Sequence, residues 1–480
     1  MPDAFNVRPQ ITVLQPDQIA YAHEQSLRAL EVTGVRVDSK RALELLAKRL
    51  GASSVKDNRV TFPREIVEWA IKAAPRTVEV FDRLGQSKFT LGQPGARFGI
   101  GVTNMYYQDP MTDEVTPFLR KHMEMGVRLG HNLPNFDVIS TLGVLRDYDP
   151  NIADAVAVLE MTANTTKPLV LLISLPSLFP VALDMLENLH GDLASKPFLL
   201  PYFNPVSPLI VNEDTVDKMF VAIERGIPFM YSNYGMAGMS TPITPAGTMV
   251  LLNAELLAGL TLAQLIKEGT PIVLGSLPAY FDMKNMIEFY DPYTILIDLG
   301  VAEIMAHYGL PHMGTSGSGS GWGPDLIEAG VAWLNHITSV IGKVGLMPFI
   351  GGTLGSMAFS PAYVVYAHEI VGRARHFARG FNLDDASVGL GEIEQVGPGG
   401  NFVLTETTLS SYRTAHYHSD IFPNMSLDRW QTQGMPNATA RLREATVALL
   451  ESSKPPEDHD AVLAKGEEFL KTVDSHSLPT

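Results

Sequence analysis

Short apolar segments alternate with longer amphipathic segments along most of the chain, from about residue 97 onward. The short segments are rich in aliphatic and aromatic residues and show little polar alternation, which is typical of strands buried on both faces. They occur at residues 98–102, 136–143, 168–174, 198–204, 228–233, 271–276, 311–316 and 346–352. Helical patterns follow near residues 119–131, 151–164, 177–190, 213–225, 246–268, 292–309, 325–343 and 361–379.

This alternation predicts the fold class. Strands buried on both faces and separated by helices form a parallel sheet that helices cover on each side. Eight consecutive strand–helix units favour a closed (β/α)8 barrel, an α/β fold whose functional site lies at the C-terminal ends of the strands. The first and seventh strands have the weakest patterns, and a doubly wound open sheet is the alternative.

The two ends of the chain do not show this alternation of strand and helix patterns. Residues 15–75 show mostly helical periodicity, and "NRVTF" and "TVEVFDR" predict two short strands. We assign residues 1–95 to an N-terminal helical and β cap, residues 96–400 to the barrel, and residues 401–480 to a C-terminal helical extension. Helices are expected near 437–452 and 459–474, joined by the linker-like "SSKPPEDHD". The pattern leaves open whether this tail packs on the barrel or on a neighbouring subunit.

Composition narrows the class of protein. The 480 residues are 45% hydrophobic and carry a formal net charge of -16 without a basic cluster, so a large core is expected and nucleic acid is excluded as a partner. The chain has no cysteine, which excludes disulfides, thiolate metal sites and a cysteine nucleophile. The most apolar run, "LLNAELLAGLTLAQLI", is interrupted by Asn253, Glu255 and Gln264. We therefore expect no membrane span and a cytoplasmic protein.

If the barrel forms, the loops after its strands supply mainly aromatic, methionine and small polar residues. These are Asn104, Tyr106, Tyr107, Tyr202, Phe203, Asn204, Ser207, Tyr231, Asn233, Tyr234, Met236, Met239, Tyr280, Phe281, His312, Thr315, Ser316, Trp322, Met357, Phe359 and Tyr363. No Arg or Lys is among them, and Asp109 and Asp282 are the carboxylates nearby. The segment "YSNYGMAGMSTPITPAG" (231–247) is typical, because it is a loop without any charge.

Aromatic rings and methionines without charge suit an alkylated cation such as a quaternary ammonium. Ring faces attract such a cation by about 0.5–2 kcal/mol per contact, and a cation without an N–H group needs no hydrogen bonds. Any single Tyr or Phe is more often a packed residue at a barrel end, and Met is a common gap-filler. The prediction therefore rests on the group of residues rather than on one member.

Other motifs have simpler interpretations. The Gly-rich segment "GTSGSGSGWG" (314–323) precedes a helix, but its spacing matches neither nucleotide-binding fingerprint, so a flexible lid or hinge is preferred over a phosphate site. "HYHSD" brings together His416, His418 and Asp420 in the tail, where polar surface is preferred over a metal site. We predict no metal site.

Several longer segments match one known family in order and spacing. They are "ALEVTGVRVDSKRALELLAKRLGA", "NRVTFPREIVEWAIKAAPRTVEVFDR", "QDPMTDEVTPFL", "KPLVLLIS", "NPVSPLIVNEDT", "GIPFMYSNYGMAGMSTPITPAGTMVLLNAELLAGLTLAQLIKEGTPIVLGS", "VGPGGNFVLTETTLSSYR" and "LDRWQTQG". With them nearly the whole chain resembles the trimethylamine methyltransferase superfamily. The chain is similar to its branch without pyrrolysine, which includes glycine betaine:corrinoid methyltransferase.

The resemblance implies a methyltransferase. Its substrate would be a quaternary or methylated amine, glycine betaine or a similar betaine, and the acceptor would be the Co(I) of a corrinoid on a separate protein that docks at the barrel mouth. A quaternary ammonium leaves as a neutral tertiary amine, so the enzyme mainly places the N–CH3 bond in line with cobalt and needs no metal of its own. No catalytic residue can be named from the sequence, and we expect a homo-oligomer.

Two sets of site residues follow from this reasoning. The predicted substrate-binding set is Asn104, Tyr106, Phe203, Asn204, Tyr234, His312, Trp322, Phe349 and Phe359. Phe349 is included because it stands where several relatives are expected to have His. The predicted corrinoid-binding set is Tyr231, Met236, Gly238 and Met239, in which the glycine would let the backbone approach a planar corrin closely.

Departures from the family leave the substrate open. Trimethylamine is disfavoured without pyrrolysine, and "SGSGSGWGPD" lacks the Asp and Lys expected there in many relatives. A betaine carboxylate would need donors such as Asn104, Asn204, Ser207, His312 and Thr315, since no Arg is evident. The alternatives are a non-catalytic or sensory binding protein for a methylated cation, and a metal-dependent barrel lyase or hydrolase, which would need convergent carboxylates and histidines.

Overall fold

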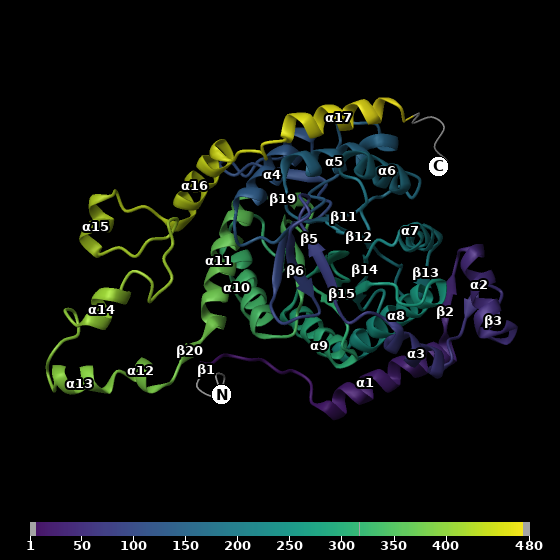
Figure 1. Cartoon of the computed structure of the whole chain (residues 1–480), viewed down its shortest axis with the longest axis horizontal. Coiled ribbons are helices and arrows are strands. Elements are labelled where there is room, and N and C mark those ends of the chain that lie inside the picture. Colours follow the sequence, from purple (N-terminus) through teal and green to yellow (C-terminus); the bar gives the residue numbers. More distant parts are fainter. Residues whose placement is uncertain (1–5, 316, 474–480) are drawn as a thin grey trace.

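Eight parallel strands close into a barrel in the computed structural model, which describes residues 6–315 and 317–473 (Figure 1). In chain order they are β7 (Arg97–Gly101), β10 (Val138–Ser140), β11 (Leu169–Leu171), β12 (Leu199–Phe203), β14 (Phe229–Ala237), β15 (Ile272–Asp282), β17 (His312–Met313) and β18 (Leu346–Thr353). Each strand pairs in parallel with the next, and β18 closes the ring by pairing with β7. The predicted barrel is confirmed, including its first and seventh strands.

A helix follows each strand and covers the outside of the barrel (Figure 1). The helices are α4 (Arg120–Asn132), α5 (Pro150–Asn164), α6 (Leu178–His190), α7 (Glu213–Glu224), α8 (Pro245–Ile266), α9 (Pro292–Tyr308), α10 (Leu326–Ile341) and α11 (Pro361–Arg379). Four of them, α5, α8, α9 and α11, begin with Pro directly after an N-cap whose side chain accepts a backbone hydrogen bond. Proline suits this position because the first helical N–H has no partner within the helix.

Helix α8 is apolar enough, by length and composition, to cross a membrane, but 78% of its most apolar window is buried inside the fold. Its three polar interruptions all have partners there. Asn253 donates to Ser26 and to Tyr308, Glu255 accepts from Asn233, and Gln264 donates to the Thr270 carbonyl. These bonds explain how α8 can be central to the core and still carry polar side chains.

The barrel interior is filled from one end. One apolar cluster combines inward-facing strand residues, such as Val138 and Met230, with Val80 and Phe89. The last two belong to a hairpin of β5 (Val78–Phe81) and β6 (Ser87–Leu91), which therefore plugs the end of the barrel at which the strands begin. The opposite end, where the strands finish, is left for a site.

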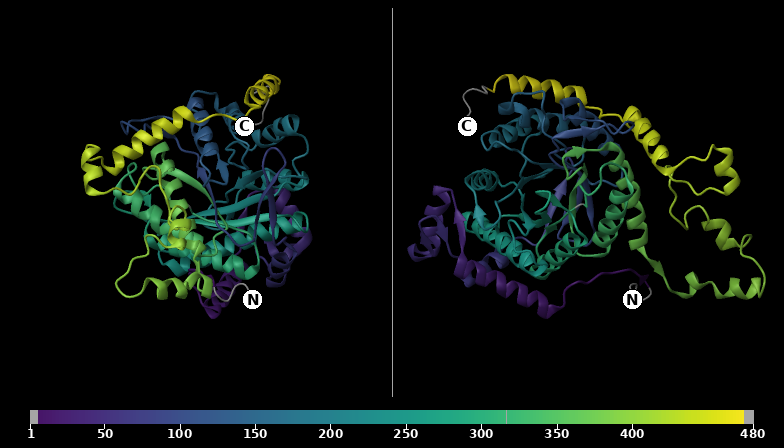
Figure 2. Two further views of the ribbon diagram at one scale, coloured as in Figure 1. Left: turned by 60° about the vertical axis from the view of Figure 1, so that its left-hand side comes forward. Right: turned by 180° about the vertical axis from the view of Figure 1, so that it is seen from behind.

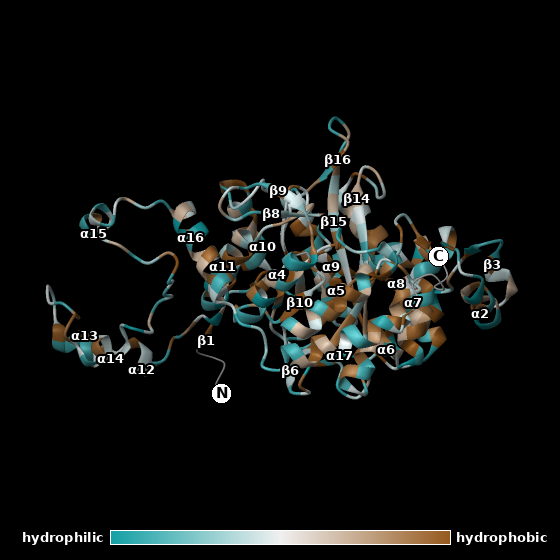
Figure 3. Ribbon diagram, turned by 90° about the horizontal axis from the view of Figure 1, so that it is seen from above, coloured by the Kyte–Doolittle hydropathy of each residue, from teal (hydrophilic) through white to brown (hydrophobic). Residues whose placement is uncertain are grey.

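Short strands extend the barrel wall at this open end. β19 (Ala358–Phe359) pairs antiparallel with β18 and parallel with β8 (Tyr106–Gln108). β8 pairs antiparallel with β9 (Val115–Pro117), and β16 (Ile287–Phe289) pairs antiparallel with β15. The long strands β14 and β15 continue beyond the barrel, so β14, β15 and β16 project from it (Figure 3). No pattern in the sequence predicts these additions.

The N-terminal region packs on α8. It contains β1 (Asn6–Val7), α1 (Pro16–Arg28), η1 (Ala29–Thr33), β2 (Val35–Val37), α2 (Lys40–Leu50), η2 (Ala52–Ser54), β3 (Val55–Lys56), β4 (Arg59–Val60) and α3 (Arg64–Ala73). Helices α1, α2 and α3 all contact α8. Strand β13 (Ile210–Val211), from the loop after β12, joins β2 in a small sheet and so ties this region to the barrel mouth.

The C-terminal region has two parts (Figures 1 and 2). Helix α16 (Ala438–Ser452) packs on α11 and α4, and α17 (His459–Lys471) packs on α5 and α6, so this part of the tail lies on its own barrel. Between α11 and α16 the chain forms β20 (Phe381–Asn382), α12 (Asp385–Val388), α13 (Leu390–Val396), α14 (Glu406–Ser411) and α15 (Leu427–Thr432). Most of this second part projects away from the barrel.

Candidate functional site

Side chains of β14 alternate between the barrel axis and the surrounding helices. Met230 belongs to the interior cluster, whereas Tyr231 packs against α8, where its ring occupies the space beside Gly259. Asn233 also points outward, since it donates to Glu255 of α8 at 2.7 Å. Because successive strand residues point to opposite faces, Ser232 and Tyr234 face the barrel axis.

Four aromatic residues gather at the open end of the barrel. Tyr202 of β12 and Phe349 of β18 belong to the interior cluster, with ring centroids 5.2 Å apart and an edge-to-face angle of 81°. Tyr234 and Tyr290 interact with each other, and Tyr290 also influences Tyr202 electrostatically. We call Tyr202, Tyr234, Tyr290 and Phe349 the aromatic ring of the mouth.

The aromatic ring is uncharged and poorly solvated. Burial raises the pKa of Tyr202 to about 12, although the neighbouring Ser232 and the hydrogen bond from Asn204 partly oppose this rise. Burial raises the pKa of Tyr234 and of Tyr290 as well, and the nearby Glu288 carboxylate adds to both shifts. The Glu288 carboxylate thus gives Tyr234 and Tyr290 a negative local field. Such a field favours a cation over an anion.

Three predicted substrate-binding residues lie at this ring. Tyr234 and Phe349 are members of it, and Asn204 donates to the Tyr202 hydroxyl at 3.2 Å. Asn204 thereby presents a polar group beside the aromatic faces. These three residues stay in the proposed site.

Other predicted residues lie behind the barrel wall. Phe203 packs against Phe179 and Phe229, Phe359 packs against Phe118, and Tyr231 packs against α8; all three are buried on the outer side of the strands. They cannot meet a ligand in the mouth without displacing a helix, because the strand pleat turns them away from the axis. We therefore leave them out of the proposed site.

Two predicted polar residues are buried in the barrel wall and do not reach the mouth. Asn104 is fully buried and donates to the Leu142 carbonyl at 2.7 Å, so it fastens the end of β7 to the next strand. His312 is buried near the closed end of the barrel, 3.9 Å from Asp298 of α9, and burial lowers its pKa to about 3. Neither residue presents a hydrogen-bond donor to the mouth, and Ser316 lies outside the described residues.

The remaining predicted residues lie on the outer rim of the mouth. Tyr106 and Trp322 are exposed, and so are Gly238 and Met239 at the tip that follows β14, while Met236 is half-buried. Gly238 has a φ of 91°, a conformation that favours glycine. Other large apolar side chains exposed nearby are Ile243 in the loop after β14, and Met283, Met286, Ile287 and Phe289 on β16 and the turn before it. We call this surface the methionine-rich rim.

Part of the aromatic ring is absent from the predicted substrate-binding set, although Tyr202 is among the residues predicted at the strand ends. Tyr290 lies between β16 and α9, not at the end of a barrel strand, so only the folded chain brings it to the mouth. Tyr202 and Ser232 stand in strands that are apolar on both faces, and such strands carry no alternation that would separate inner from outer positions. Counting alternate residues from a known inward position is the signal that would have found them.

A buried carboxylate holds the ring from outside. Glu255 of α8 accepts hydrogen bonds from Ser207, Asn233 and the Leu209 backbone, each at 2.7 Å. Asn233 in turn accepts from Ser276 of β15 at 2.7 Å. Burial raises the pKa of Glu255, and these three donors lower it. The network fixes the ends of three neighbouring strands and so positions Tyr234.

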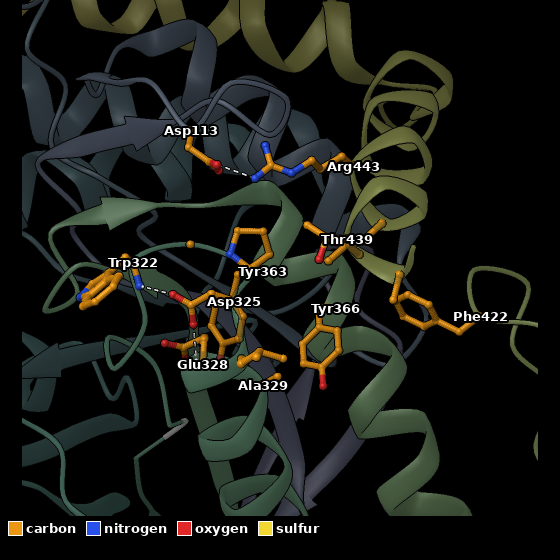
Figure 4. Close-up of a pocket in the computed structure, with 15 residues that line it drawn as sticks. Asp113, Trp322, Asp325, Glu328, Ala329, Tyr363, Tyr366, Phe422, Thr439 and Arg443 are labelled. Carbon is orange, nitrogen blue, oxygen red and sulfur yellow. Dashed lines mark hydrogen bonds and ion pairs between the residues drawn. The ribbon is translucent and has the colours of Figure 1, made fainter. Parts of the chain in front are cut away.

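The described residues also form a cavity of about 600 Å³ outside the barrel, between α10, α11 and α16 (Figure 4). Trp322, Tyr363, Tyr366 and Phe422 contribute aromatic walls, and Glu328 accepts from the Gly321 backbone at 2.5 Å. Burial raises the pKa of Glu328 to about 8. The cavity adjoins the Gly-rich loop, and Glu328 in its wall also raises the pKa of Tyr290, so the cavity lies near the aromatic ring. Among the described residues no cluster of three or more His, Asp or Glu side chains could hold a metal ion.

Sequence comparison finds related enzymes. The family described as Trimethylamine methyltransferase (MTTB) matches residues 1–474. The chain is 26% identical over 449 residues to the trimethylamine methyltransferase of Desulfitobacterium hafniense, covering 92% of this chain and 89% of that one. It is 25% identical over 474 residues to the glycine betaine methyltransferase of the same species, covering 96% and 97%. It is 26% identical over 420 residues to the proline betaine:corrinoid methyltransferase of Eubacterium limosum, covering 83% and 84%.

Structure comparison supports the fold. The monomethylamine methyltransferase of Methanosarcina barkeri matches with a TM-score of 0.51, covering 93% of this chain and 89% of that one. The two sequences are 10% identical, so this likeness concerns the barrel architecture alone.

Proposed function

The chain belongs to the trimethylamine methyltransferase family, and we propose that it transfers a methyl group from a quaternary or methylated amine to the Co(I) of a corrinoid on a separate protein. Glycine betaine or a similar betaine is the substrate that we favour, because relatives named for glycine betaine and proline betaine match over most of their length. The single observation that carries the proposal is the uncharged aromatic ring at the mouth, since it suits a methylated cation.

The aromatic ring would bind the alkylated nitrogen. Tyr202, Tyr234, Tyr290 and Phe349 offer ring faces and edges, and Glu288 adds a negative field from the rim. Each ring contact with a cation contributes about 0.5–2 kcal/mol, and the contribution grows when water is excluded. This arrangement selects a permanent cation over its neutral amine product, so the product would leave more easily than the substrate.

The reaction needs little from the chain beyond binding and orientation. The electron pair of the broken N–CH3 bond stays on nitrogen, so a neutral tertiary amine leaves and no proton has to move. The corrinoid, when docked, supplies Co(I) and with it the electron pair that accepts the methyl group. The task of the chain is to hold one N–CH3 bond pointing out of the mouth toward the docked partner.

A betaine carboxylate would need hydrogen-bond donors in the same space. Asn204 and Ser232 stand beside the Tyr202 hydroxyl and form the polar side of the ring. We propose that these two residues receive the carboxylate, in place of the arginine that such an anion often meets. This polar side would distinguish a betaine from a simple tetraalkylammonium ion.

The methionine-rich rim fits a docking partner of this kind. Met239 is 61% exposed, and Met283 and Met286 are more exposed still, on strands that project around the mouth (Figure 3). Exposed apolar groups in one area often mark an interaction surface, and methionine adapts to the shape of a partner. We propose that the corrinoid protein docks here and that Met236 and Gly238 approach the corrin. Because Co(I) is strongly reducing, we also place the protein in the cytoplasm, which is kept reducing.

The test is a methyl-transfer assay with Co(I) corrinoid protein and a panel of quaternary and tertiary amines. We expect loss of the Co(I) absorption with glycine betaine or another betaine, and a stoichiometric amount of the demethylated amine by mass spectrometry. Binding of an amine by calorimetry, without turnover of any amine in the panel, would instead favour a non-catalytic binding protein for methylated cations. Stoichiometric bound zinc in active protein would favour the metal-dependent alternative.

A further inference from the structure

Residues 383–414, which we call the arm, project from the barrel as a loop of short helices (Figures 1 and 2). The arm is fastened at both of its ends. Before it, Phe381 and Asn382 pair with β1, and after it Tyr417 packs against α11, with Arg373 over its ring at 5.1 Å. Between these anchors lie α12, α13 and α14.

The arm has a regular structure but no core. Helices α12, α13 and α14 have 4, 7 and 6 residues, and no residue of these three fully described helices is buried. Asp384 and Thr405 nevertheless cap α12 and α14 with side-chain hydrogen bonds. Isolated helices of this length are unstable in water, and packing of an apolar face is what normally stabilises them. The arm therefore requires a surface that this chain does not itself supply at that place.

The composition of the arm indicates what kind of surface this is. Its exposed large apolar side chains are Leu383, Val388, Leu390, Ile393, Phe402, Val403, Leu404, Leu409 and Tyr412. Its charged side chains are five carboxylates and one arginine, namely Asp384, Asp385, Glu392, Glu394, Glu406 and Arg413. A fitting surface is therefore apolar and basic.

Helix α10 and the loop that follows it form such a surface, which we call the acceptor face. At its N-terminal end Leu326 is 91% exposed beside the cavity of Figure 4, and Ile327, Trp333 and Leu334 are exposed along the helix. At its C-terminal end it reaches a cavity of about 910 Å³ at the closed end of the barrel. The basic residues that line this cavity are Arg8, Arg76, Arg97, Lys343, Arg375 and Arg379, and no described lining residue is Asp or Glu. Asp137 behind the lining pairs with Arg97 and Arg375, so the remaining four supply the basic charge.

We propose that the arm of one copy of this chain packs on the acceptor face of a second copy, reciprocally. Both surfaces lie on the same side of the barrel, around α10 and α11 (Figure 1), so a twofold axis on that side brings each arm to the other acceptor face. If the apolar side chains of the arm each expose on the order of 100 Å², two exchanged arms reach about the area of a stable interface.

A second copy explains the arm better than two other occupants do. The arm leads away from its own acceptor face between two fixed anchors, so folding back would require release of β20 or Tyr417. The corrinoid protein would dock at the mouth, whereas the basic cavity lies at the closed end, where β7 and β17 begin. The inference does not depend on the proposed activity.

The first test is sedimentation velocity of the full-length protein with three variants. Wild type is expected to form dimers at micromolar concentration, less tightly in high salt because part of the contact is electrostatic. L404E on the arm and L326E on the acceptor face are each expected to yield monomers that keep the wild-type circular dichroism spectrum. Val32, exposed in the N-terminal region, provides the control V32E, which should stay dimeric. Monomeric wild type, or dimers in both L404E and L326E, would overturn the proposal.

The second test is complementation by co-expression of L404E and L326E with different affinity tags. A mixed dimer retains one intact arm on one intact face, so the two tags are expected to co-purify, whereas neither variant pairs with itself. The absence of cysteine allows a direct check, with L404C and L334C on separately tagged chains and a thiol cross-linker. Cross-linking between the two chains supports the proposal. A single chain that carries both cysteines provides the opposite outcome. If it cross-links only within itself and runs at the mass of a monomer, the arm packs on its own barrel.

Discussion

The inner and outer faces of the barrel wall carry similar side chains and have different roles. On β14, Tyr231 is fully buried against α8, while Tyr234 faces the axis and interacts with Tyr290. On β12, Phe203 packs outward between two other phenylalanines, while Tyr202 meets Phe349 inside the barrel. The position of a residue in the pleat, rather than its type, therefore decides whether it can meet a ligand.

The outer face also determines the shape of the inner one. Glu255 accepts from Asn233, the neighbour of Tyr234 in the chain, and from Ser207 in the loop after β12. Asn233 accepts from Ser276 on the next strand. Damage to the outer layer is thus expected to act first on stability, and damage to the inner layer first on binding.

Tyr231→Ala is the strongest test of the different roles of the outer and inner faces. Removing a large, fully buried side chain from between β14 and α8 is expected to destabilise the fold by about 3–5 kcal/mol. Urea unfolding followed by circular dichroism measures this loss. Tyr234→Ala is the matched control, because its half-buried ring leaves a smaller void. Equal losses of stability in the two variants would contradict the assignment of faces.

A buried carboxyl group of the outer layer is expected to make the stability of the protein depend on pH. This effect is smaller than that of Tyr231→Ala. The pKa of Glu328 is about 8 in the folded protein, well above its ordinary value of 4.5, so the folded state holds a proton that the unfolded state releases. The contribution of Glu328 to the free energy of unfolding is therefore complete below pH 4.5 and is lost as the pH rises toward 8. Glu328→Gln cannot titrate, so between pH 6 and 8 wild type should lose about 2–3 kcal/mol relative to it.

Urea unfolding of both proteins at pH 6 and pH 8 measures this difference. Amine binding to wild type should change little over the same interval, because Tyr202 has a pKa of about 12 and stays neutral. A constant difference in stability between wild type and Glu328→Gln would show that Glu328 is ionised throughout.

The same contrast explains how much the sequence could predict. The eight strands and eight helices were predictable because each carries a long apolar pattern, and even the two residues of β17 lie within one. The faces were not predictable, because "FLLPYFN" and "PFMYSN" are apolar on both sides and give no alternation to read. The predicted site therefore included Phe203 and Tyr231, whereas their neighbours Tyr202 and Ser232 are the residues that face the mouth.

Residues far from the strand ends were harder still. Tyr290 reaches the mouth from the segment between β16 and α9, and Phe359 lies in β19, one of the short added strands that no pattern predicted. Asn104 looked like a free donor, but its amide is bonded to the Leu142 carbonyl across to the next strand. In each case contacts between distant segments, which a single sequence does not reveal, decide the role.

Tyr234→Leu and Phe359→Leu compare the inner and outer faces by their effect on ligand binding. Replacing the inward Tyr234 is expected to weaken binding of the methylated cation by about 0.5–2 kcal/mol, because one ring contact is lost. Replacing the outward Phe359, which packs on Phe118, should leave the affinity unchanged. Calorimetric titration with glycine betaine or the best amine of the panel measures both. Weaker binding in Phe359→Leu alone would place the binding site on the outer side of the wall.

Met239→Ala is expected to have the smallest effect, since it lies beyond the wall on the methionine-rich rim. Its side chain is 61% exposed and borders the mouth without joining the aromatic ring. If the corrinoid protein docks there, truncation should raise the KM for that protein a few-fold, an amount typical of about 0.5–1 kcal/mol at an interface. Amine affinity and unfolding should not change. Val32→Ala, exposed far from the mouth, is the control. An altered amine affinity in Met239→Ala would mean that the rim and the aromatic ring form one binding surface rather than two.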